Sequence, residues 1–184
     1  MANFELYYPK LRKAEGGYAS AEFAAKYHDK GGETYLGIAR NYNPTWEGWP
    51  IIDAYKLKNG VPKHYFIFPD PHLDELAKTH SKKVYWDKLI LDQVANQSVA
   101  EYFMDYGFNS GLRTATKAVQ RIVGAPIDGG MGTTTLGFIA KFDQKDLFNK
   151  LMNARVALIT NSPTIDPKNK PGLISRAKSF VFVP

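Results

Sequence analysis

Apolar residues recur along the chain at spacings that predict a protein built mainly of helices. Within residues 4–15 the apolar side chains stand three or four positions apart, at Phe4, Tyr7, Tyr8 and Leu11. This spacing places them on one face of an α-helix. Pro9 falls inside the window and predicts a kink or a later start, and Gly16-Gly17 predicts the helix end.

Similar patterns predict further helices at 51–58, 73–83, 112–123, 143–160 and 172–181, with another opening at the Thr133-Thr134-Thr135 cluster. A long apolar pattern over 85–108 predicts a long helix that stops at Asn109-Ser110-Gly111. Residues 20–27 fit either a short helix or an insertion. Residues 34–38 are β-branched and aromatic and follow two adjacent glycines, so we expect one small β-hairpin near residues 29–40. The fold class is therefore mainly α.

Composition narrows the class of protein. The chain has 184 residues, of which 44% are apolar and 23% charged, as in ordinary soluble domains. Cysteine is absent, which excludes disulfides, thiolate metal sites and a cysteine nucleophile. We expect no membrane-spanning helix and no signal peptide, because no long apolar run or basic leader is present. The histidines show no metal-ligand spacing, at positions His28, His64, His72 and His80.

Charge and aromatic content leave several partners open. The formal net charge is +6, and residues 141–184 hold eight Lys and Arg against three Asp. A basic end of this kind attracts nucleic acid, anionic lipid or an anionic wall polymer, or is simply a solvated helix face. Aromatic residues reach 14% of the chain, and they fill cores but also stack on sugars and bases.

The candidate chemistry centres on Glu15. At about 100° per residue, Glu15 lies three turns and roughly 20° beyond Phe4, on the apolar face at the end of the predicted helix. A carboxyl group desolvated there has a raised pKa and can act as a general acid. Glycosidic bond cleavage needs such an acid with a partner that positions water, and a hairpin close by could supply it. The alternative is a surface Glu15 paired with Arg12.

The motifs around Glu15 resemble those of a known family. Glu15-Gly16-Gly17-Tyr18 and the stretch Asp29-Lys30-Gly31-Gly32-Glu33-Thr34-Tyr35-Leu36-Gly37-Ile38 resemble the signature of glycoside hydrolase family 108. These are N-acetylmuramidases of the lysozyme-like superfamily in phages, prophages and bacteria. Residues 84–87 and 99–111 resemble the family's central helix, and 118–124, 128–132 and Thr135 its predicted peptidoglycan-binding part. The segments 19–28 and 59–72 depart from the family's pattern.

The resemblance implies roles for individual residues. Glu15 matches the catalytic acid, and Asp29 and Thr34 match hairpin positions that flank the attacking water. The expected substrate-binding residues are Tyr18, Gly31, Gly32, Tyr35, Trp86 and Asn109. Structural roles remain as alternatives: a turn cap for Asp29, a strand surface position for Thr34, a hairpin turn for the glycines, a helix cap for Asn109 and the protein core for the aromatic residues.

The resemblance also implies an overall organisation and activity. We expect a lysozyme-like, two-lobed helical fold, with residues 1–111 catalytic and 112–184 a helical, peptidoglycan-binding part packed on the first as one globular unit. The expected reaction is hydrolysis of the β-1,4 bond between N-acetylmuramic acid and N-acetylglucosamine, with no cofactor and no metal. The partner is peptidoglycan rather than nucleic acid or a membrane, and the protein is expected to be a monomer.

Release and role follow from the same resemblance. Without a signal peptide, holin-type export or lysis would bring the protein from the cytoplasm to the cell wall or periplasm, as an endolysin, prophage or secretion-activator protein. Three rival functions remain: a non-catalytic wall-binding protein, a basic nucleic-acid-binding protein and a lytic transglycosylase. The first would bind wall without releasing reducing ends, and the last would leave anhydro-muramyl ends.

Overall fold

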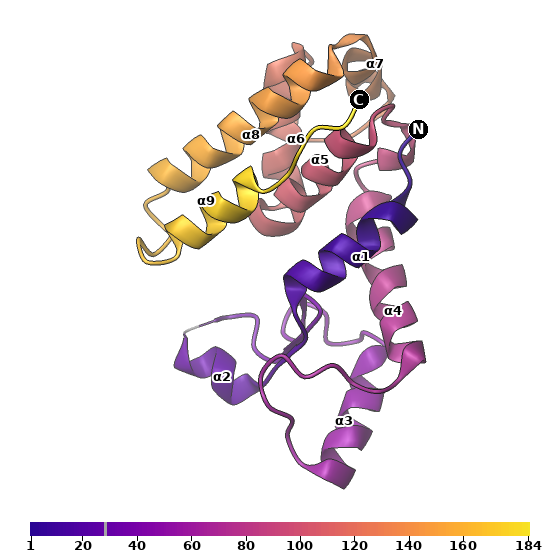
Figure 1. Cartoon of the computed structure of the whole chain (residues 1–184), viewed down its shortest axis with the longest axis vertical. Coiled ribbons are helices and arrows are strands. Elements are labelled where there is room, and N and C mark those ends of the chain that lie inside the picture. Colours follow the sequence, from indigo (N-terminus) through magenta and orange to yellow (C-terminus); the bar gives the residue numbers. More distant parts are fainter. Residues whose placement is uncertain (28) are drawn as a thin grey trace. The chain divides into compact units, whose positions relative to one another are not determined.

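A computed structural model of the chain describes residues 1–27 and 29–184. In this part of the chain there are nine α-helices and one three-stranded antiparallel sheet (Figure 1). The expectation of a mainly α fold with a small β-hairpin is therefore confirmed. The chain forms two compact units, which we call the sheet unit (Glu5–Ser81) and the helical unit (Met1–Phe4 with Lys82–Pro184). The expected division at residue 111 stays a prediction.

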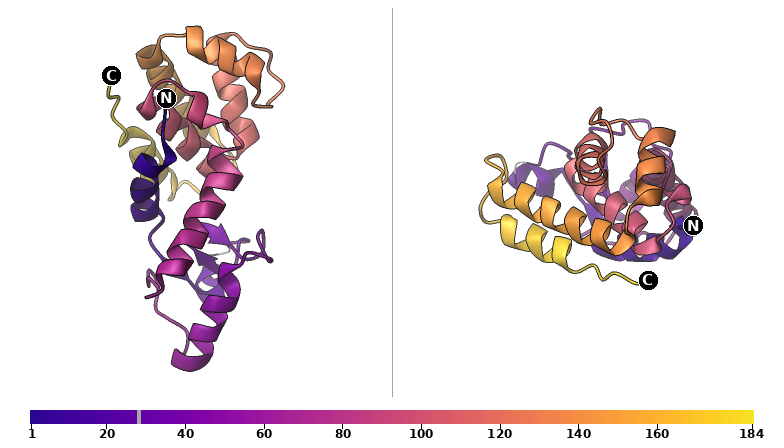
Figure 2. Two further views of the ribbon diagram at one scale, coloured as in Figure 1. Left: turned by 90° about the vertical axis from the view of Figure 1, so that its right-hand side faces the viewer. Right: turned by 90° about the horizontal axis from the view of Figure 1, so that it is seen from above.

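The sheet unit carries all three strands. Its elements are α1 (Phe4–Glu15, of which only the first residue belongs to the helical unit), β1 (Tyr18–Ala19), α2 (Ala21–Lys26), β2 (Thr34–Tyr35), β3 (Ile38–Ala39), α3 (Gly48–Asn59) and α4 (Pro71–Ser81). The strand order is β1-β2-β3, and β2 and β3 form the expected hairpin (Figure 2, left). Leu36 and Gly37 turn the chain between them, both with positive φ (46° and 79°), which is typical of a two-residue hairpin turn.

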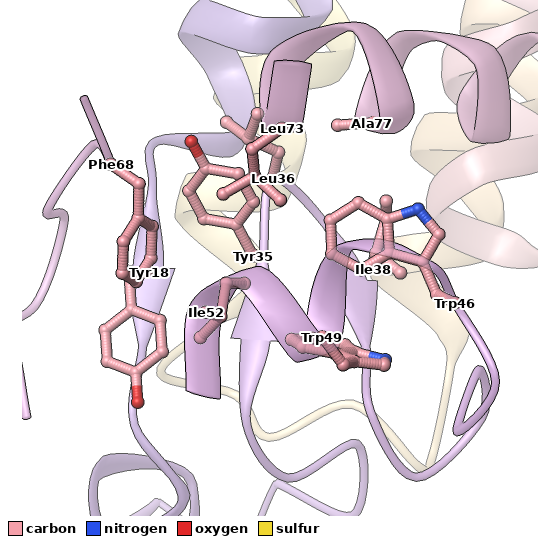
Figure 3. Close-up of a cluster of buried hydrophobic side chains, with 10 residues drawn as sticks. All are labelled: Tyr18, Tyr35, Leu36, Ile38, Trp46, Trp49, Ile52, Phe68, Leu73 and Ala77. Atoms are coloured by element: carbon pink, nitrogen blue, oxygen red, sulfur yellow. The ribbon is translucent and has the colours of Figure 1, made fainter. Parts of the chain in front are cut away.

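Buried aromatic and aliphatic side chains hold the sheet unit together. They come from the strands, from α3 and α4 and from the connecting loops, and Figure 3 shows them converging: Tyr18, Tyr35, Leu36, Ile38, Trp46, Trp49, Ile52, Phe68, Leu73 and Ala77. Each large side chain removed from water stabilises the fold by about 1.5–3 kcal/mol. The hairpin is short, so this packing rather than its few backbone hydrogen bonds fixes its position.

The helical unit is a bundle around one buried helix. It contains a π-helical turn (Lys82–Trp86), a 3₁₀ turn (Leu91–Gln93), α5 (Gln97–Ser110), α6 (Leu112–Val123), α7 (Thr133–Lys141), α8 (Gln144–Asn161) and α9 (Lys170–Lys178). Every residue from 98 to 107 of α5 is buried. Helix α5 packs against α6 and α8, and α9 lies alongside α8 (Figure 2, right).

A buried charge cluster links three helices of this unit. Asp105 on α5 is 1% exposed and pairs with Arg155 on α8 at 2.7 Å and with Arg176 on α9 at 2.6 Å. A carboxylate this deep in a bundle needs cationic partners, because leaving it unpaired would carry a large desolvation cost. The cluster therefore fixes how α8 and α9 seat against α5.

Three local expectations are corrected by the structure. The apolar pattern over 85–108 is not one helix: Ile90 adopts left-handed φ (51°), and α5 begins only after Asn96, whose side chain accepts a hydrogen bond from Val99 N–H. Helix α7 begins after Gly132, which has no capping side chain, so the threonines lie inside its first turn. Helix α1 starts at Phe4 with Pro9 inside it, so the later start does not occur.

No helix in the described residues is long and apolar enough to span a bilayer.

Candidate functional site

Glu15 is the last residue of α1 and is half-buried. The two glycines after it are required by the backbone. Gly16 has φ of +74°, which a residue with a Cβ adopts only under strain, and a Cβ on Gly17 would lie 2.6 Å from the carbonyl oxygen of Phe66. Glycine thus lets the chain leave the helix sharply and run against residues 65–66.

Backbone hydrogen bonds then fix the segment that follows Glu15. Tyr18 N–H donates to Phe66 C=O at 2.9 Å, and Tyr65 N–H donates to Tyr18 C=O at 2.8 Å. On the other side, Leu36 N–H donates to Gly17 C=O at 3.3 Å. Because three residues span at most about 11 Å, Glu15 is held within that distance of the sheet at Tyr18.

Thr34 lies on the strand next to this segment. In the register of β1 and β2, Thr34 faces Ala19, four residues after Glu15. Its side chain is half-buried, and its hydroxyl donates to Gly32 C=O at 3.0 Å. A hydroxyl that donates its proton in this way keeps lone pairs that can accept a hydrogen bond from a water molecule.

Asp29 and the two glycines after it build the turn that leads into β2. Asp29 is exposed and its Oδ1 accepts a hydrogen bond from Gly31 N–H at 2.8 Å, as a turn-capping aspartate does. Gly32 has φ of +69° and lies against the Asn41 side chain, where a Cβ would come within 2.8 Å. A Cβ on Gly31 would lie 2.9 Å from that of Ala39. The turn is thus built for close packing.

The three predicted aromatic contacts are core side chains. Tyr18 and Tyr35 are each 1% exposed and lie in the cluster of Figure 3, and Trp86 is fully buried. Trp86 packs edge-on against Phe4 and its Nε1–H donates to Asp92 at 2.6 Å. These rings support the structure from inside and present no open face to a sugar.

Asn109 and Trp86 belong to the helical unit rather than to the unit that holds Glu15. Asn109 is exposed, and its side-chain amide donates to Asp105 C=O at 2.8 Å, one turn earlier in α5. This is the bond of a residue near a helix end, in keeping with the capping alternative.

A buried ionic network beside the hairpin was not singled out by the sequence. Glu33 is 7% exposed, and its Oε1 accepts hydrogen bonds from the Tyr18 hydroxyl at 2.5 Å and from Lys56 Nζ at 2.6 Å. Arg40 Nε lies 2.7 Å from the other carboxylate oxygen. Burial and the bond to Glu33 raise the pKa of the Tyr18 hydroxyl well above its usual value.

Arg40 and Lys56, the cations of this network, also form ion pairs with Asp53. Arg40 donates to both carboxylate oxygens of Asp53, at 3.0 and 2.7 Å, and lowers the pKa of that carboxyl. The Arg40 guanidinium also lies over the Trp49 ring, 4.4 Å from its centre. A signal for Glu33 was present, since it stands inside the glycine motif, but its cationic partners are 7 and 23 residues away and no spacing marks them.

Residues 118–132 of the helical unit, which resemble the family's predicted peptidoglycan-binding part, form hydrogen bonds among themselves. The Gln120 side-chain amide donates to Asp128 at 2.7 Å and to Gly130 C=O at 3.0 Å, and its oxygen accepts from Gly129 N–H at 2.9 Å. The Gly130 N–H and the Gln120 amide lower the pKa of Asp128. The polar groups of this turn therefore hold its shape.

Two hollows open elsewhere on the surface. One of about 500 Å³ lies in the helical unit between α6 and α8, and one of about 450 Å³ lies in the sheet unit between the end of α3 and residues 68–70. Neither is lined by Glu15. Within residues 1–27 and 29–184, no three His, Asp or Glu side chains gather in a way that could hold a metal ion.

Comparison with known proteins gives a family and a structural relative. The sequence model of the family described as Glycosyl hydrolase 108 matches residues 8–111, a range that includes Glu15 and the hairpin. Among solved structures, the chain is similar to that of Brucella abortus SagA, at 26% sequence identity and a TM-score of 0.67, covering 96% of this chain and 94% of that chain. A comparison with curated proteins gave no match.

Proposed function

Because the chain belongs to the glycosyl hydrolase 108 family, we propose that it hydrolyses the β-1,4 bond between N-acetylmuramic acid and N-acetylglucosamine, with Glu15 as the general acid. Membership makes the chain a glycoside hydrolase and implies peptidoglycan-degrading activity. The choice of bond and of acid is our proposal, and it stands on the surroundings of Glu15.

One observation carries the assignment of Glu15. Glu15 is the last residue of α1. Backbone hydrogen bonds hold the chain after it to Phe66 on one side and to the strand that carries Thr34 on the other. A general acid must be held in one position relative to the bond it protonates, since small displacements cost large factors in rate. The glycine turn and its hydrogen bonds supply that rigidity.

The reaction divides between Glu15 and the hairpin. Glu15 donates its proton to the glycosidic oxygen as the bond breaks, so that the leaving sugar departs as a neutral alcohol. The Thr34 hydroxyl accepts a hydrogen bond from the attacking water and orients it toward the anomeric carbon. Asp29, one oxygen of which is engaged by Gly31 N–H, has lone pairs left for the same water and accepts the proton that the water releases as its oxygen bonds to the anomeric carbon. These steps require no metal ion or cofactor.

The test compares Glu15→Gln with wild type on purified peptidoglycan. We expect the amide, which has no acidic proton, to abolish the release of reducing ends while the far-UV circular dichroism spectrum stays unchanged. The matched control is Glu47→Gln, because Glu47 is exposed and its side chain caps no helix. Equal release by wild type and Glu15→Gln would reject Glu15 as the acid.

Mass spectrometry of the products separates the rival functions. Reducing N-acetylmuramic acid ends support hydrolysis, whereas anhydro-muramyl ends would identify a lytic transglycosylase. Binding to the wall without new ends of either kind would identify a wall-binding protein. We further propose that the protein reaches the wall from the cytoplasm by holin-type release or lysis, in an endolysin, prophage or secretion role.

A further inference from the structure

Four aromatic rings form a continuous row in the sheet unit. The Tyr27 and Phe23 rings lie 4.7 Å apart between centres, Phe23 and His64 stack at 3.8 Å with an interplanar angle of 16°, and His64 and Tyr65 lie 3.8 Å apart. The two ends are exposed, Tyr27 at 62% and Tyr65 at 67%. We call these four residues the aromatic row.

The row ends at the residue next to Glu15. The Tyr65 ring lies so close to Gly16 that a Cβ at Gly16 would come within 2.7 Å of the ring. The backbone of Tyr65 is fixed by its N–H, which donates to Tyr18 C=O at 2.8 Å. The exposed ring is therefore held in a defined place beside the proposed acid.

Tyr65 is also strained. Its φ of +66° is in the left-handed region, which is unfavourable for a bulky residue with a Cβ. A ring that is two-thirds exposed contributes little to the core, so folding alone gives no reason for keeping a tyrosine rather than a glycine there. Strained and exposed side chains of this kind concentrate at binding sites.

The two halves of the row come from segments that are far apart in the sequence. Phe23 and Tyr27 stand four positions apart in and just after α2, within the 19–28 segment, and therefore share one helix face. His64 and Tyr65 lie in the 59–72 segment. The two segments meet at the Phe23–His64 stack, so folding brings the four rings together from two separate parts of the chain.

We propose that the aromatic row is a binding surface for a polysaccharide strand, with Tyr65 stacking on the sugar nearest the bond that Glu15 cleaves; this inference rests on the proposed function. Pyranose rings present C–H faces that pack on aromatic rings, and phenol and imidazole groups hydrogen-bond to sugar hydroxyls at the ring edges. Lys26, 5.8 Å from the Tyr27 ring centre, adds a positive charge for the carboxylates of peptidoglycan stem peptides.

A polysaccharide fits this surface better than a protein partner. Protein docking sites are broader apolar patches with a dry centre. The row instead begins at Tyr65, beside the residue that follows the proposed acid, and continues through successive ring contacts to Tyr27.

Binding is measured apart from cleavage to test the proposal. In the Glu15→Gln background, binding to purified peptidoglycan is followed by co-sedimentation, and Tyr65→Gly is compared with the parent. Loss of one stacked ring should weaken binding by about tenfold. Leu57→Ala is the matched control, because Leu57 is 92% exposed and lies on α3, which contributes no ring to the row.

Stability separates a binding role from a structural one. Glycine relieves the positive φ of Tyr65, so Tyr65→Gly should unfold at the same or a higher temperature than its parent while binding more weakly. Tyr65→Trp, which restores a ring, should recover the binding. If Tyr65→Gly binds peptidoglycan as tightly as its parent, or if Tyr65→Trp fails to recover binding in a folded protein, the proposal is overturned.

Kinetic measurements in the wild-type background distinguish failure of the binding surface from failure of the proposed catalytic function. Tyr65→Gly should raise KM for soluble peptidoglycan fragments about tenfold with a smaller change in kcat. If Glu15→Gln still cleaves but Tyr65→Gly loses binding, the acid is misassigned and the binding surface stands. If Glu15→Gln is inactive and Tyr65→Gly leaves both binding and KM unchanged, the acid stands and the binding surface is wrong.

Discussion

The hydroxyl group of Tyr18 donates a 2.5 Å hydrogen bond to Glu33, and this bond links the segment that follows Glu15 to the turn that precedes Thr34. Tyr18 is three residues after Glu15, and Glu33 is directly before Thr34. The two halves of the proposed site are thus tied through a buried side-chain pair as well as through the strand register.

Replacing Glu33 by Gln should destabilise the protein and weaken catalysis together. The amide leaves Lys56 and Arg40 partly buried without the carboxylate between them, at a cost of about 2–4 kcal/mol in the free energy of unfolding. Urea unfolding measures this loss. Asp53→Asn is the control, because Asp53 is 49% exposed and should cost less than about 1 kcal/mol. Equal losses in the two variants would contradict a special role for Glu33.

Alanine at Gly17 should misplace Glu15. The new Cβ would meet the Phe66 carbonyl at 2.6 Å, so the segments must separate and the Tyr18–Phe66 hydrogen bond must lengthen. We expect about 2 kcal/mol of destabilisation and at least a hundredfold loss of kcat/KM. Gly137→Ala, in the open middle of α7, is the control and should stabilise by about 0.5–1 kcal/mol. Full activity in Gly17→Ala would show that this close approach is dispensable.

Alkaline pH should destabilise the helical unit through Tyr102. Burial raises the pKa of its hydroxyl from 10.0 to about 12. Since the folded-state pKa is the higher one, the unfolded chain releases the proton first, and stability falls as pH rises from about 10 to about 12. Urea unfolding at several pH values should show a smaller slope over this window in Tyr102→Phe. An unchanged slope would assign the alkaline loss to other groups.

Attachment to the wall should depend on salt through residues 141–184. The Debye screening length shortens from about 10 Å at 0.1 M ionic strength to about 3 Å at 1 M, so an electrostatic attachment weakens steeply as salt is added. The double variant Lys168→Glu with Lys178→Glu, both at exposed positions, should bind peptidoglycan several-fold more weakly at low salt and with less salt dependence. Lys88→Glu, an exposed charge reversal outside this segment, should have a smaller effect. If binding to peptidoglycan does not change with salt concentration, residues 141–184 form only a solvated basic surface and do not attach the protein to the wall.

Local pattern was sufficient for most of the secondary structure. The apolar spacing of residues 4–15 and the glycines after them placed Glu15 at a helix end, and the strand-like residues 34–38 gave the hairpin, because both signals are short in sequence. The pattern failed over 85–108, where Ile90 breaks the helix by a backbone conformation that no residue type at that position announces.

The sequence by itself determined the helices, the hairpin and the motif around Glu15, since each depends on neighbours a few positions away. Only the tertiary structure decided which aromatic rings are core and which are surface: Tyr18, Tyr35 and Trp86 are buried, whereas Tyr65 is exposed beside Gly16. The tertiary structure also determines that Lys56 forms an ion pair with Glu33. The burial of a ring and the partner of a charge depend on segments that folding brings together from far apart in the chain, and no local spacing encodes that meeting.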